Sequence, residues 1–66
     1  MKNSSGTDKS LCPCCGRTGV EEYDICPVCG WENDPVQLRK PDFAGGANKM
    51  SLEQARNAYK AGEPVQ

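Results

Sequence analysis

Residues 12–30 read CPCCGRTGVEEYDICPVCG and contain every cysteine of the chain. This segment is one short motif written twice, because the CPCCG of residues 12–16 recurs as the CPVCG of residues 26–30. Cysteine, proline, cysteine and glycine occupy the same places in both copies, and only Cys14 against Val28 differs. We predict that each copy forms a tight turn that presents two thiolates to one cation.

The residue types around the cysteines suit such a turn. Proline after the first cysteine restricts φ and removes one amide donor, and glycine after the second cysteine accepts a positive φ. Two such turns that face each other place four sulfurs in a tetrahedron, the geometry that zinc adopts with Zn–S bonds of about 2.3 Å. The predicted metal ligands are Cys12, Cys15, Cys26 and Cys29, with Zn²⁺ as the expected metal and iron as the alternative for the same four thiolates.

Cys14 is left over, since its counterpart Val28 offers no ligand atom. We interpret Cys14 as a small side chain on the surface of the turn. The alternative is a free reactive thiol, whose thiolate form a neighbouring metal and Arg17 would favour. The chain has no histidine, which excludes Cys–His nucleophilic pairs and mixed Cys/His metal sites.

The length of 66 residues allows a single domain with a small core. A chain of this size buries only about 60% of the surface that its unfolded form exposes, so we expect a bound metal to supply much of the folding free energy. The sequence shows no signal peptide and no apolar run of membrane length, which favours a cytoplasmic protein over a secreted disulfide scaffold. The formal net charge of −1 becomes more negative with four thiolates and one Zn²⁺, which disfavours general binding to phosphate backbones.

Few elements are predicted on either side of the cysteine motifs. Residues 1–10 are polar and without periodicity, so we expect a disordered N-terminal tail. Residues 20–25 alternate in polarity and are expected to form a short strand that brings the second turn back toward the first. Residues 63–66 are expected to form a C-terminal tail, so that one domain spans residues 11–62.

A C-terminal helix is predicted at about residues 51–61. Ser51 and Gln54 match a capping box, and Gly62 suits the position after the helix. An apolar stripe at helical spacing is expected to dock against the aromatic residues of the chain. Its members are Leu52, Ala55 and Tyr59, and the expected contacts are Trp31 and Phe43.

The segment after the second cysteine turn is predicted to be irregular. Trp31 is expected to cover the metal site and exclude water, with a base-stacking or partner-docking role as the alternative. The acidic residues Glu32, Asp34 and Asp42 lack the spacing of an EF-hand, so we favour a solvated loop over a second cation site. Residues 44–48 (AGGAN) are expected to form a close-packed turn, because no phosphate-loop sequence follows the glycines.

Together these motifs resemble the bacterial CPCC cysteine-rich domain family. The resemblance covers about residues 11–62 and implies a small α+β domain of the zinc-ribbon type, similar to the rubredoxin double knuckle, with a short β-hairpin or strands and one C-terminal helix. It implies no particular biochemical activity. Asn33 stands where members of the family often carry an acidic residue. The matching stretches are CPCCG at residues 12–16, ICPVCGWEND with the following Pro35 at residues 25–35, GGAN at residues 45–48 and SLEQARNAY at residues 51–59.

Three functions are compatible with this reading. Four thiolates fill a tetrahedral coordination sphere and leave no open position for a substrate, so we expect a non-catalytic zinc module that binds another protein. The second interpretation is a zinc ribbon that binds nucleic acid, and the third is a rubredoxin-like iron protein in redox chemistry. The candidate interaction surface comprises Trp31, Phe43, Arg39 and Lys40, and the other cations that could contact nucleic acid are Arg17, Lys49, Arg56 and Lys60.

Overall fold

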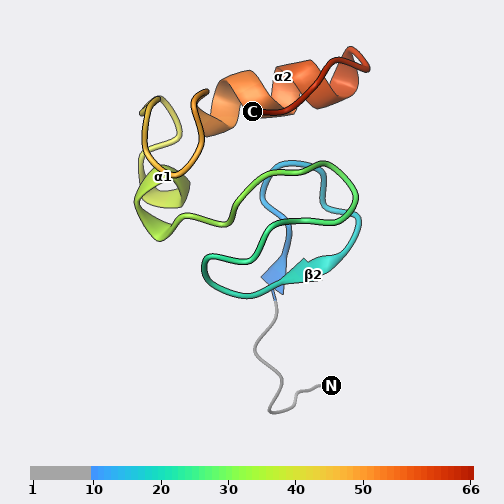
Figure 1. Cartoon of the computed structure of the whole chain (residues 1–66), viewed down its shortest axis with the longest axis horizontal. Coiled ribbons are helices and arrows are strands. Elements are labelled where there is room, and N and C mark those ends of the chain that lie inside the picture. The colour runs from blue at the N-terminus through green and yellow to red at the C-terminus, as the bar shows by residue number, and fades with distance from the viewer. Residues whose placement is uncertain (1–9) are drawn as a thin grey trace.

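The computed structural model describes residues 10–66 and has a small α+β fold. Along the chain its elements are β1 (Ser10–Leu11), β2 (Gly19–Val20), α1 (Pro35–Arg39) and α2 (Leu52–Lys60). In Figure 1, α2 lies across one side of the hairpin and its loops, and α1 lies at one end. The predicted fold class is confirmed, with α1 as an additional element. Residues 1–9 of the predicted tail lie outside the described residues, whereas Ser10 belongs to β1 rather than to a tail.

The β-hairpin is short, with two residues in each strand. β1 and β2 pair antiparallel, with Ser10 opposite Val20. The predicted strand over residues 20–25 is wrong beyond Val20, because Ile25 makes only an isolated bridge to Glu32. Residues 21–25 therefore bring the second cysteine turn back to the first without forming a strand.

A local turn interrupts the predicted strand. The Asp24 carboxylate accepts a hydrogen bond from the Glu21 amide at 3.1 Å, and the Asp24 amide donates to the Glu21 carbonyl at 3.0 Å. Side chain to backbone bonds of this kind compete with the ladder of a sheet. Tyr23 adopts a φ of 66° inside this turn, a left-handed conformation that bulky residues rarely adopt.

Helix α1 was not predicted, and its N-cap explains why it forms. The Asp34 side chain accepts a hydrogen bond from the Val36 amide at 2.9 Å, and Pro35 occupies the first turn, where its missing amide costs nothing. The other Asp34 oxygen accepts from the Ala47 amide at 3.1 Å. Asp34 is only 7% exposed, so the prediction of a solvated acidic loop is wrong for this residue.

A buried pair of amide side chains joins α1 to the loop that follows it. Gln37 is 0% exposed, and its side-chain nitrogen lies 3.0, 3.3 and 3.1 Å from the carbonyl oxygens of Phe43, Asn48 and Met50. Its oxygen accepts from the backbone and side-chain nitrogens of Asn48 at 3.0 and 2.8 Å. Asn48 in turn exchanges two hydrogen bonds of 2.9 Å with the backbone of Glu32. Two side chains therefore satisfy the polar groups of a loop that has no regular structure.

The predicted close packing of the AGGAN loop is confirmed at Gly46. A Cβ at this position would lie 2.8 Å from Oδ2 of Asp34 and 3.0 Å from Cδ of Gln37. Both of these side chains are buried and held by hydrogen bonds, so neither can move aside without losing bonds.

Gly46→Ala is therefore expected to lower the free energy of unfolding by about 1–3 kcal/mol, the usual cost of overpacking. Urea unfolding of the folded, metal-loaded chain measures the change. Ala44→Ser, at an exposed position of the same loop, is the matched control and should change stability by less than about 0.5 kcal/mol. Equal losses in the two variants would argue against a packing role for Gly46.

The predicted capping box opens α2. Ser51 Oγ accepts from the Gln54 amide at 3.1 Å, and Gln54 Oε1 accepts from the Ser51 amide at 2.8 Å. The buried face is turned from the predicted stripe, because Ala58 is buried and Tyr59 is only half-buried. The buried residues of α2 are Leu52, Ala55 and Ala58.

The hydrophobic core is small and contains two of the cysteines. The expected contribution of Phe43 is wrong, because this residue is exposed. Residues 63–66 fold back instead of leaving the domain as a tail, since Val65 packs against the core and the Gln66 carbonyl accepts from the Lys49 amide. Within residues 10–66, neither helix has the length and apolarity to cross a membrane. The core cluster is Cys12, Val20, Cys26, Trp31, Leu52 and Ala55.

Candidate metal centre

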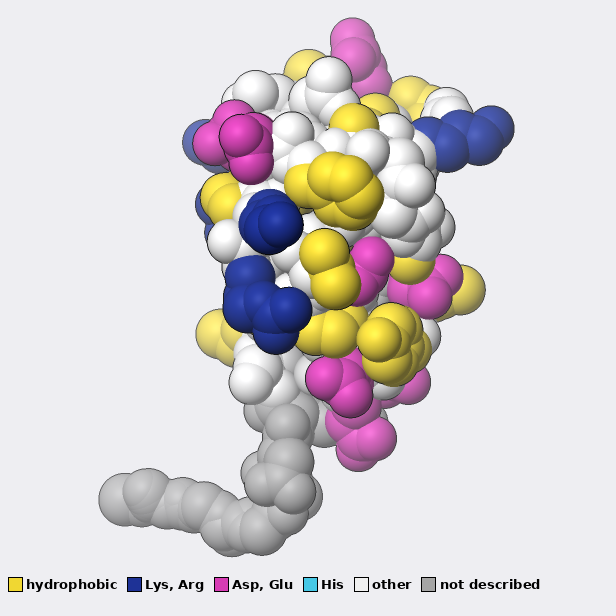
Figure 2. All heavy atoms as spheres, turned by 90° about the vertical axis from the view of Figure 1, so that its left-hand side faces the viewer, with side chains coloured by type: hydrophobic (Ala, Val, Ile, Leu, Met, Phe, Trp, Pro, Cys, Tyr) yellow, Lys and Arg dark blue, Asp and Glu magenta, His cyan; other side chains and the backbone are white. Residues whose placement is uncertain are grey.

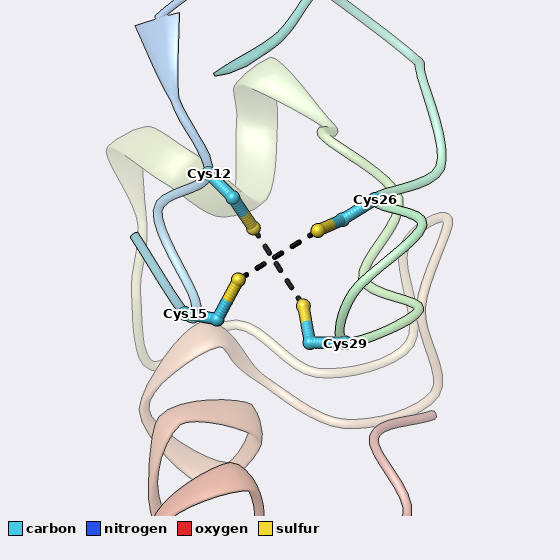
Figure 3. A group of neighbouring side chains, drawn as sticks. All are labelled: Cys12, Cys15, Cys26 and Cys29. Carbon is cyan, nitrogen blue, oxygen red and sulfur yellow. Dashed lines mark hydrogen bonds between the residues drawn. The ribbon is translucent and has the colours of Figure 1, made fainter. Parts of the chain in front are cut away.

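Four cysteine side chains point toward a common centre from two loops (Figure 3). Cys12 and Cys15 come from the turn after β1, and Cys26 and Cys29 come from the second turn. Their Sγ atoms all lie within 4.8 Å of one another. The structure thus brings together the four residues that the repeated motif singled out.

The distances between sulfurs fit one tetrahedral ion. Metal–sulfur bonds of about 2.3 Å give a tetrahedron whose edges are about 3.8 Å, whereas a disulfide bond measures about 2.05 Å. The Sγ atoms are 3.6 Å apart between Cys12 and Cys29 and 3.7 Å apart between Cys15 and Cys26. All five cysteines are free thiols. The arrangement is consistent with a zinc knuckle and not with a disulfide scaffold.

The two cysteine turns have the same backbone geometry, as the sequence repeat predicts. The Gly16 amide donates to the Cys12 carbonyl and the Gly30 amide donates to the Cys26 carbonyl, each at 2.9 Å. Both glycines have a positive φ, 68° for Gly16 and 88° for Gly30, which a residue with a Cβ adopts at a cost. Each CPxCG motif therefore encodes its own turn within five residues.

Backbone amides and crowding act on the thiols in opposite directions. Burial disfavours the Cys26 thiolate, but the amides of Cys29 and Val28, together with the neighbouring Cys15 and Cys29 thiols, outweigh burial and lower the pKa of Cys26 to about 7. Burial raises the pKa of the Cys15 and Cys29 thiols. Four thiolates this close repel one another unless a cation lies between them. A divalent cation removes that penalty and deprotonates the thiols it binds, so this donor set suits a metal ion.

Trp31 lies in the same buried cluster as Cys12 and Cys26 and is 0% exposed. This burial agrees with its expected role as a cover for the sulfurs. Its alternative role, on a surface that stacks on bases or docks a partner, is wrong because the ring is inaccessible. The Trp31 Nε1 atom has no hydrogen-bond partner within the described part of the chain.

Cys14 is half-buried and packs against the core cluster. Burial raises the pKa of its thiol, although a contact with Cys29 acts in the other direction. The contact of Cys14 with the core cluster agrees with its interpretation as a small packing side chain.

Cys14→Val introduces the residue that the second turn carries at the equivalent place. We expect one metal ion per chain and a change in the free energy of unfolding below about 1 kcal/mol, because the side chain is of similar size and supplies no ligand. Metal analysis and thermal unfolding measure the two quantities. Loss of the metal in this variant would show that Cys14 is a ligand.

The other predicted interaction residues do not meet at the metal site. Phe43, Arg39 and Lys40 are exposed on α1 and the turn that follows it. Arg56, a predicted nucleic-acid contact, instead donates from Nε to the Pro13 carbonyl at 2.8 Å and so joins α2 to the first cysteine turn.

Sequence reasoning missed three residues that shape the surroundings of the site. Gln37 and Asn48 carry no local signal, because each acts through partners far along the chain. Asp34 did carry one. An Asp followed by Pro is a recognised start of a helix, and this signal could have predicted α1.

A comparison with protein families matches residues 10–62 to the model described as "Cysteine-rich CPCC". The matched range contains both cysteine turns, α1 and α2. No curated protein matches the chain.

Proposed function

The chain belongs to the cysteine-rich CPCC family, and from this premise we propose that it is a non-catalytic zinc module that binds another protein. The observation that supports this function most directly is the spacing of the four sulfurs, 3.6 and 3.7 Å for the two opposed pairs. Four thiolates at these distances complete the coordination of one ion and leave no position for an activated water or a substrate.

The same four sulfurs favour a structural role for the metal. Cys12 and Cys26 belong to the hydrophobic core itself, together with Trp31. Zinc bound by Cys12, Cys15, Cys26 and Cys29 would offset part of the charge of the four thiolates and cross-link the two turns beside the apolar core. Zn²⁺ binds more tightly than Fe²⁺ in the usual order of divalent metals, and it accepts tetrahedral thiolate sites readily.

Metal analysis combined with native mass spectrometry tests the zinc assignment. The chain is purified without added metal from cells grown with both zinc and iron. We expect one zinc ion per chain and a colourless protein. A red chain that contains iron would contradict zinc and support the rubredoxin-like alternative, because ferric thiolate sites absorb visible light.

The role in protein binding is supported by the number of large apolar side chains that folding leaves exposed. A chain this small needs most of its large apolar side chains for its own core, so large apolar side chains left in solvent favour a role in binding. Affinity capture with the metal-loaded chain as bait tests this role. We expect a stoichiometric protein partner, and zinc-dependent turnover of a small molecule without any partner would contradict it. The exposed side chains are Leu11, Tyr23, Ile25, Val28, Val36, Leu38 and Phe43.

Nucleic-acid binding is expected to be absent. Trp31 is fully buried and Arg56 is held by the Pro13 carbonyl, so the proposed stacking residue and one proposed cation are both engaged within the fold. A gel-shift titration at low salt, where phosphate contacts are strongest, measures this. A shift with protein in the range of about 10 µM would contradict the expectation.

A further inference from the structure

Helix α1 is packed the opposite way from an ordinary surface helix. Its polar residue Gln37 is 0% exposed, whereas Val36 and Leu38 are 38% and 47% exposed. A helix on a hydrophobic core normally buries its apolar residues. Here the hydrogen bonds of Gln37 hold the helix in place, so folding makes little use of the two apolar side chains.

Two exposed aromatic residues extend this apolar surface. Phe43 is held close to α1, because its carbonyl accepts from Gln37 at 3.0 Å and its amide donates to the Lys40 carbonyl at 2.9 Å. Tyr23 is held at the start of α1, because its amide donates at 2.8 Å to the carbonyl of Asn33. Figure 2 shows hydrophobic side chains gathered on this side of the molecule. Val36 and Leu38 lie on the two flanks of α1, on either side of the buried Gln37. We call the exposed surface around α1, with Val36, Leu38 and the neighbouring Tyr23 and Phe43, the α1 face.

Tyr23 gives an independent reason to look for a partner here. Its φ of 66° is unfavourable for a bulky residue, and its side chain is exposed. Glycine or asparagine would suit this backbone better. The tyrosine is therefore not explained by folding, and a ring offered to another molecule does explain it.

Charges of opposite sign lie at the two ends of the α1 face. Arg39 and Lys40 end the helix, with Asp42 as a single carboxylate close by in the sequence. The turn that carries Tyr23 lies at the other end and is acidic, and the helix between the two ends is about 7.5 Å long. In Figure 2, Lys and Arg side chains lie to the left of the hydrophobic group, and Asp and Glu side chains lie below it and to its right, with others at the upper left. The acidic residues of the turn are Glu21, Glu22 and Asp24.

We propose that the α1 face binds a second copy of this chain about a twofold axis. The proposal rests on the proposed function as a protein-binding module, and it names the partner. A twofold interface must be complementary to itself. An axis through the middle of α1 places the apolar side chains against each other and brings Arg39 and Lys40 of each copy to the acidic turn of the other. A uniformly acidic partner would instead meet repulsion from that turn.

The small area of the α1 face limits the expected affinity of the dimer. Standard interfaces bury about 800 Å² per partner, and four side chains supply less than this. Dimerisation is therefore expected at concentrations on the order of 100 µM rather than nanomolar. Because the charged ends are exposed, added salt should weaken the dimer by about tenfold.

Sedimentation equilibrium of the metal-loaded full chain tests the proposal. The average mass should rise from the 7.2 kDa of one chain toward twice that value between about 10 µM and about 1 mM at low salt. Leu38→Gln should weaken association at least about tenfold, while Leu11→Gln, at an exposed position of β1, should leave it unchanged. A wild-type chain that stays monomeric at the highest concentration, or equal behaviour of the two variants, would overturn the proposal.

A charge exchange tests the twofold arrangement itself. One chain carries Arg39→Glu with Lys40→Glu, and the other carries Glu21→Lys with Glu22→Lys. Each variant should be monomeric alone, because both ends of its α1 face then have the same sign. A mixture of the two should associate at least as well as the wild type, since opposite charges meet at both ends. A mixture that associates no better than either variant alone would overturn the proposed arrangement.

Two controls separate this proposal from the function on which it rests. One metal ion per chain and an unchanged circular dichroism spectrum establish that each variant is folded. A folded, metal-loaded chain that remains monomeric but binds a different protein would overturn the second copy as the partner and leave the zinc module standing. A chain that binds no metal would instead contradict the proposed zinc module itself.

Discussion

Cys26→Ser is expected to yield a chain that neither retains a metal ion nor folds. Cys26 supplies one of the four converging sulfurs and is also part of the core cluster. Structural zinc contributes on the order of 10 kcal/mol of apparent folding free energy, which exceeds the stability that a small domain has to lose. Metal analysis and the fluorescence of the buried Trp31 measure the two effects. Treating the wild-type chain with a chelator should reproduce the unfolded state.

Cys14→Val is the matched control, because it removes the one cysteine outside the cluster. The serine variant should differ from it completely in metal content and in structure. A Cys26→Ser chain with native circular dichroism and a sharp thermal transition would contradict a structural role for the metal. So would a wild-type chain that keeps its fold after the metal has been removed.

Gln37→Leu is expected to destabilise the metal-loaded chain by at least about 3 kcal/mol. Leucine has a similar volume but supplies no hydrogen bond, so the carbonyls of Phe43 and Met50 and the buried amides of Asn48 lose their partner. Unsatisfied buried polar groups cost about 1–3 kcal/mol each, and several are created here. Urea unfolding with the metal present measures the loss.

The neighbouring position Leu38 provides the control for this variant. Leu38→Gln changes an exposed side chain on the same helix and should alter the stability of the monomer by less than about 0.5 kcal/mol. A Gln37→Leu chain as stable as the wild type would mean that the loop does not depend on the buried amide. Metal content should stay at one ion per chain in both variants, because neither residue contacts the sulfurs.

Short-range patterns predicted the features that depend on short-range bonds. Each CPxCG motif closes its turn by a hydrogen bond from the glycine to the first cysteine, and the repeat alone identified which of the five cysteines converge. The capping box of α2 joins Ser51 and Gln54, three residues apart. Such features form wherever the local sequence occurs, so the surrounding fold has little influence on them.

Predictions failed where distant residues compete with local preference. The strand expected over residues 20–25 stops after Val20, because Asp24 folds the chain back on itself. Asp34 was expected in solvent, but it caps α1 and also holds the amide of Ala47. Trp31 is different, because its expected role as a cover for the metal site agrees with its packing against Cys12 and Cys26, which decided against the exposed alternative.

The amino-acid sequence by itself therefore determined the two cysteine turns and the final helix, because each depends on bonds between residues a few positions apart. The four sulfurs meet across 11 and 17 residues, and they could be predicted only because the sequence repeats one ligand motif and a metal needs four thiolates. Tertiary structure alone decided the burial of Gln37 and Asn48, which bond to each other across 11 residues, and with it the exposure of Val36 and Leu38. A polar side chain is buried only where distant backbone groups meet it. The sequence of the helix does not reveal these contacts, because they form only when the folded chain brings the distant residues together.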